Sequence, residues 1–266
     1  MPITRVPDLS RFLKNTTHIC LEFRAAPASS GPPADAVVQW LAHRSGVDAG
    51  SPGIQAHLEE LRRRRRGGHS IPAVAKRSGT PLTLARSSRL LSLFNYAKFE
   101  VGGLTVSVDI LNAGNELGLD EAVPTESVEV FVLSCPREDI APSMASLLLE
   151  LVSDLPVTFA FGGSTAFTAR FAFGLQLKQA GPEAGRTPRE FLWPLMFTRA
   201  LPNPDSLADA GLFRSEKHHG GYLLQMWTTL ANGQHEAYRQ AAHELNLGCL
   251  WDLRSPGIED ARSRAD

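Results

Sequence analysis

The side chains of this chain that could do chemistry are mainly carboxylates, and they are concentrated between residues 101 and 155. This segment contains ten Asp and Glu residues against one basic residue, Arg137, so its formal charge is −9. Residues 1–100 carry the opposite charge, +8, from fifteen Lys and Arg against seven Asp and Glu. Such a division of charge concerns partners and association rates rather than fold.

Two interpretations of the acidic stretch 109–139 are open. Charged residues in a loop or at a sheet edge keep the surface solvated and discourage aggregation. The same charge could instead form an electrostatic surface that steers and holds a basic partner.

Five consecutive arginines, Arg62–Arg66, are the most conspicuous local feature. They could contact phosphate groups of a nucleic acid. Alternatively, they spread around the end of a helix, where cations interact favourably with the helix dipole and stay solvated. We favour the second interpretation because no aromatic residues alternate with the arginines and the whole chain has a formal charge of −1.

Histidines and glycines offer no recognisable catalytic or metal-binding motif. His218 and His219 are adjacent, so on an extended segment they point to opposite faces, and a turn with solvated histidines is predicted there. His235 and His243 are eight residues apart, not four as in the helical zinc motif. The segment 162–164, Gly-Gly-Ser, lacks the GxSxG pattern and is predicted to be a turn.

Acid–base catalysis would require two carboxylates that converge in a cleft. Glu22 and Asp109 lie on predicted strands, and the alternation of side chains predicts that both face solvent. We therefore expect no enzyme, no metal and no cofactor. An enzyme of unrecognised type remains an alternative, and a deep pocket holding a perturbed titratable group would identify it.

The composition indicates a globular chain in a reducing compartment. Cys20, Cys135 and Cys249 are far apart and each has apolar neighbours, so no disulfide is expected. No stretch approaches the roughly 18 apolar residues of a membrane span. Charged residues among the first fourteen interrupt any signal-peptide core. A cytoplasmic location without membrane contact is the expectation.

Helices and strands mix without a βαβ rhythm. Strands are predicted over 17–24, 101–111, 127–133, 157–161 and 221–228, and helices over 35–43, 54–65, 143–153 and 235–247. Asp35 is the expected N-cap of the first helix, Gly248 the left-handed residue after the last, and Thr187–Glu190 a capping box. The prediction is an α+β fold, a mostly antiparallel sheet with helices packed on one face. The predicted domain organisation is a single compact domain over 1–254 followed by a frayed tail over 255–266.

Three segments together resemble the immunity protein 52 family of bacterial polymorphic-toxin systems. They are Gly103–Asn112 running into a Gly- and acid-containing loop, Val128–Leu133, and His219–Gln225 followed by a loop and a helix. Within that family the chain looks like the immunity partner of a type VI secretion effector with a restriction-endonuclease-fold toxin domain. The basic segment 62–89 departs from the family pattern.

The resemblance implies cytoplasmic neutralisation of a DNase by tight binding, with no cofactor and no small-molecule substrate. It gives the acidic stretch a role, because a DNase presents cationic groups to phosphate. Under this hypothesis six residues contribute to the partner surface: Asn112, Asn115, Glu116, Asp120, Glu121 and Glu126. The alternative is a nucleic-acid-associated accessory protein that uses the basic segment 62–89, and steeply salt-dependent binding would reveal it.

Overall fold

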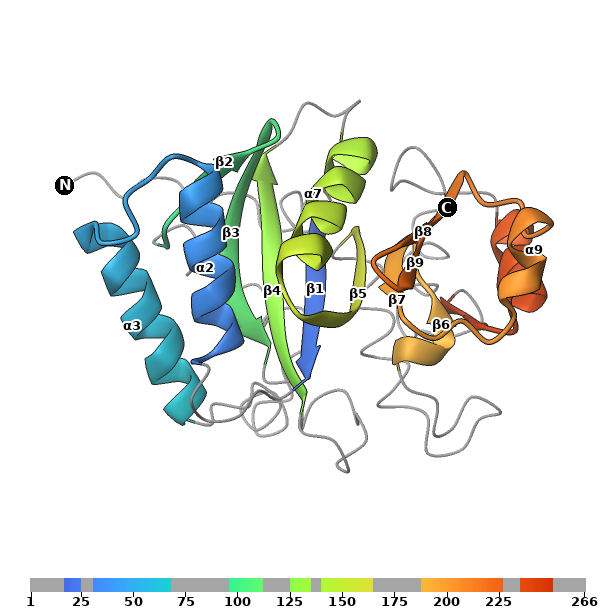
Figure 1. Cartoon of the computed structure of the whole chain (residues 1–266), viewed down its shortest axis with the longest axis horizontal. Helices are drawn as coiled ribbons and strands as arrows, with labels where there is room; N and C mark the ends of the chain where they lie inside the picture. Colours follow the sequence, from blue (N-terminus) through green and yellow to red (C-terminus); the bar gives the residue numbers. More distant parts are fainter. Residues whose placement is uncertain are drawn as a thin grey trace, which may run out of the picture.

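The computed structural model describes residues 17–24, 31–67, 96–111, 125–134, 140–164, 188–226 and 235–250. Within these ranges, eight strands form one sheet in which all neighbours are antiparallel. In spatial order they are β2 (Phe99–Val101), β3 (Leu104–Leu111), β4 (Thr125–Ser134), β1 (Thr17–Arg24), β5 (Val157–Ser164), β7 (Leu195–Thr198), β9 (Gly221–Gln225) and β8 (Arg214–His218). The first of the described strands, β1, thus lies between β4 and β5 (Figure 1). The predicted α+β class with a mostly antiparallel sheet is confirmed.

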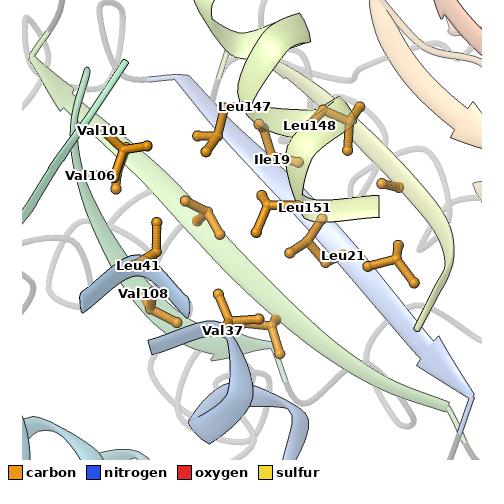
Figure 2. Close-up of a cluster of buried hydrophobic side chains, with 14 of the residues drawn as sticks. Ile19, Leu21, Val37, Leu41, Val101, Val106, Val108, Leu147, Leu148 and Leu151 are labelled. Carbon is orange, nitrogen blue, oxygen red and sulfur yellow. The ribbon is translucent and has the colours of Figure 1, made fainter. Parts of the chain in front are cut away.

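Three helices cover one face of this sheet: α2 (Pro33–Arg44), α3 (Pro52–Gly67) and α7 (Ile140–Asp154). The apolar stripes predicted for them are all buried: Val37, Val38 and Leu41; Ile54, Leu58 and Leu61; Met144, Leu147, Leu148 and Leu151. They pack in one cluster with strand side chains such as Ile19, Leu21, Val106 and Val108 (Figure 2). The alternating apolar residues of each strand therefore define the face that the helices cover.

The opposite face of the sheet carries a second buried cluster. Its members include residues from four neighbouring strands: Cys20, Phe159, Phe161, Met196 and Leu224. Trp193 is fully buried and stacks on Phe161 with ring centroids 4.0 Å apart. The helix α9 (His235–Glu244) and the short parallel strands β6 (Phe191–Leu192) and β10 (Gly248–Cys249) complete this cluster. Both faces of the sheet are consequently covered.

Two predicted helix caps are wrong. The N-cap of α2 is Pro32, without any side-chain cap, and the carboxylate of Asp35 instead accepts hydrogen bonds from Arg62 on α3. Gly248 lies in β10, and the left-handed residue after α9 is Asn246, with φ of 55°. Asparagine tolerates this conformation because its short polar side chain can bond locally. The predicted capping box at 187–190 begins only a 3₁₀ turn, η3 (Pro188–Glu190).

Glycines take different roles from those predicted. The expected single strand over 101–111 is broken by Gly102 and Gly103, whose φ values of 57° and 78° form a two-residue hairpin turn between β2 and β3. Gly162 and Gly163 form no turn but continue β5 opposite Ile19 and His18. A Cβ on Gly162 would lie 3.0 Å from the carbonyl oxygen of His18, so glycine permits the strands to approach there.

The C-terminal strands contain a hairpin of which only the second strand was predicted. His219 and Gly220, with φ of 45° and 73°, make the turn between β8 and β9, so the turn predicted at this position is confirmed. A second 3₁₀ turn, η4 (Pro204–Ala208), lies between β7 and β8. No helix in the described part of the chain has the length and apolar character needed to cross a membrane. The proposed boundary after residue 254 lies outside the described residues.

Candidate partner-binding surface

The six residues predicted to contact a partner surround the connection between β3 and β4. Five of them lie outside the described residues: Asn112, Asn115, Glu116, Asp120 and Glu121. Glu126 lies on β4, where its backbone is opposite Phe23 of β1. Leu111, the last residue of β3, is opposite Ser127. The two ends of the connection 112–124 are therefore held on neighbouring strands at one end of the sheet.

Three carboxylates lie on the second face of the sheet, next to this connection. Asp109 and Glu129 are directly opposite each other on β3 and β4, and their residues are 0% and 1% exposed. Glu22 on β1 is also 0% exposed and is opposite Ser127. The prediction that Glu22 and Asp109 face solvent is wrong. Alternation separates the two faces of a strand correctly, but it does not reveal that both faces are covered.

Glu22 is held by an ion pair with Arg189, which belongs to η3 and lies 167 residues further along the chain. The Arg189 Nε and Nη2 atoms lie 3.0 and 2.9 Å from Glu22 Oε2. Burial raises the pKa of the Glu22 carboxyl above its ordinary value, and the neighbouring guanidinium opposes this rise. Glu22 Oε1 has no hydrogen-bond partner in the structure. The pair therefore leaves part of the desolvation cost of Glu22 uncompensated.

The three carboxylates Glu22, Asp109 and Glu129 do not form a metal site. Among the described residues, no three His, Cys, Asp or Glu side chains are placed to hold an ion. Cys20 and Cys249 are buried and take part in no disulfide. His218 Nε2 lies 2.8 Å from the hydroxyl oxygen of Ser153 and so connects the β8–β9 hairpin to α7. His219 is exposed at the turn.

Two arginines of the run, Arg62 and Arg63, are engaged within the molecule. Arg62 donates through Nε and Nη2 to Asp35 on α2, and this hydrogen bond raises the pKa of Arg62. Arg63 forms an ion pair with Glu60, one turn earlier on α3, at 2.7 Å. These contacts agree with the interpretation that the arginines spread around the end of a helix. The remaining basic segment, from 68, lies outside the described residues as far as residue 95.

Sequence reasoning missed a group of polar and aromatic residues that joins α2 to α7. Trp40 Nε1 donates a hydrogen bond of 2.8 Å to Asp154 Oδ2, and Arg44 lies 5.2 Å from the centre of the Trp40 ring. Arg44 Nη2 is also 2.8 Å from Glu150 and 3.6 Å from Asp154. Two carboxylates thus share one guanidinium. Spacing within each helix gives no signal for this group, because the contacts between α2 and α7 join residues more than 100 positions apart.

We expect Arg44→Ala to lower the free energy of unfolding by about 1 kcal/mol or less, because the three charged side chains are 42–47% exposed and screened by water. Urea denaturation at low and high salt measures it, and the loss should shrink in high salt. Arg44→Met is the matched control, since it keeps the aliphatic stem over Trp40 and loses only the charge. A loss above about 2 kcal/mol that salt leaves unchanged would contradict the expectation.

A groove opens beside this group, between the β2–β3 turn and α7. It is lined by residues 101–103 of the hairpin and by one face of α7, namely Pro142, Ser143, Ser146, Leu147 and Glu150. Its volume is about 440 Å³. We call it the α7 groove. Val101 and Leu147 give it an apolar floor, because both side chains belong to the core cluster on that face.

No protein-family model matches this chain, and no curated protein matches it. Among solved structures, the chain is similar to the Pseudomonas aeruginosa T6SS protein PA0821, with 12% sequence identity and a TM-score of 0.35. The match covers 90% of this chain and 73% of that one. This is a distant likeness, and no residue role is carried over from it.

Proposed function

We propose that this protein is an immunity protein of the immunity protein 52 type, which binds and neutralises a cognate bacterial toxin in the cytoplasm. The proposed toxin is a DNase of restriction-endonuclease fold, the effector domain of a type VI secretion system. The protein acts by binding alone, without catalysis and without a cofactor. The observation that carries the proposal is the segment 112–126, which contains four carboxylates and no lysine or arginine.

The fold brings the two ends of this segment onto neighbouring strands. Because β3 and β4 are adjacent and antiparallel, the connection between them leaves from and returns to the same end of the sheet. A DNase must present Lys and Arg side chains to phosphate groups, so a dense acidic surface complements it. Complementary charge of this kind raises association rates from about 10⁵–10⁶ to as much as about 10⁸–10⁹ M⁻¹s⁻¹ at low salt.

Toxicity rescue tests the function directly. The effector encoded beside this gene is expressed in a naive bacterium, with and without this protein, and the two proteins are purified together. We expect survival and a stable complex. Death despite good expression of both proteins, without a complex, would overturn the pairing. A nucleic-acid titration over a salt series would then test the alternative in which residues 62–89 bind nucleic acid.

The binding surface has its own test, the triple charge reversal Glu116→Lys, Asp120→Lys and Glu121→Lys. We expect association with the toxin to slow at least about tenfold at low salt and to lose most of its salt dependence. The matched control reverses three exposed acids elsewhere, Asp205, Asp209 and Glu236. If both triple variants associate at the same rate as the wild type, the acidic connection is not the partner surface.

A further inference from the structure

We propose that the α7 groove is a second binding slot, separate from the acidic connection, and that it takes an arginine or lysine side chain presented by a partner protein. This goes beyond the proposed function, because it concerns the opposite end of the sheet. The groove borders Gly103 at the start of β3, whereas the connection follows Leu111 at its end. Seven steps of about 3.3 Å separate the two ends by roughly 23 Å.

The shape and chemistry of the groove favour a long side chain with a charged tip. Val101 and Leu147 are almost fully buried and provide an apolar floor along which an aliphatic stem can lie. Ser143, Ser146 and Glu150 follow at one-turn spacing on α7, so two hydroxyl groups and then a carboxylate border the groove. A volume of about 440 Å³ is within the range of ligand pockets, about 300–1,000 Å³, and exceeds the needs of one side chain.

The β2–β3 turn forms the other wall of the groove, and its two glycines contribute no side chain to it. Neither Gly102 nor Gly103 has another atom within 4 Å of the place where a Cβ would stand, so the wall there is bare backbone. Both residues have positive φ, which glycine alone adopts without strain. The turn therefore offers backbone groups, and no side chain, to an incoming residue.

The charged side chains around the groove favour the binding of one more cation. Among the residues that the structure describes, Glu150 is the one charged residue that lines it. Arg44 binds Glu150 through Oε2 but also lies 3.6 Å from Asp154, so one guanidinium faces two carboxylates. His218 reaches Ser153 in the last turn of α7.

The test uses the whole isotope-labelled protein and two small probes of equal shape. N-acetyl-arginine amide carries the guanidinium charge, whereas N-acetyl-citrulline amide is its neutral analogue. NMR titration should shift the amide signals of Gly102, Gly103, Ser143, Ser146 and Glu150 with the arginine probe. We expect millimolar affinity, at least about tenfold weaker binding of citrulline, and about threefold weaker arginine binding by Glu150→Gln.

Two further variants keep the proposal falsifiable. Ser146→Trp places a large ring in the groove at an exposed helix position and should abolish the shifts, whereas Gln240→Trp on α9 should leave them unchanged. Equal binding of both probes, shifts located elsewhere, or unaltered binding by Ser146→Trp would each overturn the proposal. These outcomes do not depend on the toxin, so they separate this proposal from the proposed immunity function.

Discussion

Replacing Arg189 with alanine is expected to lower the free energy of unfolding by about 2–3 kcal/mol at pH 7. Removing one partner of a buried ion pair costs about 3–5 kcal/mol because it leaves a buried charge alone. Glu22 is fully buried, but the side chain of Arg189 is 44% exposed, so water replaces part of what is lost. Urea denaturation of the wild type and the variant measures the difference.

The pH dependence of this loss has a definite sign. Burial raises the pKa of Glu22 in the folded protein above the ordinary value of 4.5. Between that value and the raised one, the unfolded chain releases its proton first, so stability falls as the pH rises. Without Arg189 the folded pKa is raised further. The deficit of Arg189→Ala should therefore grow above about pH 4.5 and disappear in more acidic solution.

A second substitution isolates the cause of the deficit. Glu22→Gln in the Arg189→Ala background removes the buried charge and should recover most of the loss at pH 7, with no further pH dependence from this site. A deficit of Arg189→Ala that is the same at pH 4 and pH 7 would instead indicate lost packing. The guanidinium lies 5.8 Å from the Phe159 ring, which is the contact that such a result would implicate.

The alanine substitution of Gly221 is expected to cost about 3 kcal/mol. A Cβ at this position would lie 2.5 Å from Cζ and 2.7 Å from Cε2 of Phe197, and 2.8 Å from the carbonyl oxygen of Thr198. Phe197 is fully buried, so its ring cannot turn away, and the carbonyl oxygen belongs to the strand backbone. The hairpin and β7 must therefore separate, which denaturant unfolding would measure.

Gly53→Ala is the matched control for this clash. Gly53 lies on α3, and no atom is within 4 Å of the position of an added Cβ. Because alanine is the better helix former, stability should stay unchanged or rise by up to about 1 kcal/mol. If Gly221→Ala is as stable as the wild type while Gly53→Ala behaves as expected, β9 does not approach β7 closely enough to exclude a Cβ.

Local patterns in the sequence were sufficient to predict the helices and the central strands. On α7, Met144, Leu147 and Leu151 recur at helical spacing, and the strict alternation of Leu104, Val106 and Val108 marks β3. Each of these side chains is buried on the face predicted for it. Local pattern and tertiary packing agree in these elements, and the prediction held for that reason.

Several of the missed features depend on residues distant in sequence. The burial of Glu22 and Asp109 follows from coverage of the second face, which strand alternation does not reveal. Strand β8, with the sequence Arg-Ser-Glu-Lys-His, has no apolar alternation because it is a sheet edge held only by β9 among the described strands. The α7 groove and the residues around Arg44 arise where α2 and α7 meet, a contact that no local spacing encodes.

The candidate sites also differ in whether the local sequence reveals them. The acidic connection was predicted from charge alone, and only its anchors, Leu111 and Thr125, are placed by the structure. The pair Glu22–Arg189 joins residues 167 positions apart, so no motif search would find it. Co-variation of positions 22 and 189 in related sequences is the kind of information that could have found it.

The position of β1 in the middle of the sheet has a consequence for synthesis on the ribosome. Its partners β4 and β5 end at Ser134 and Ser164, so the strand that is made first must wait for 140 further residues before both of its edges are paired. At about 5–20 residues per second this interval lasts roughly 7–28 s. Throughout that time Ile19, Leu21 and Phe23 are available to other chains. We expect the nascent chain to be a substrate for chaperones that shield extended apolar segments, until β5 has left the ribosome.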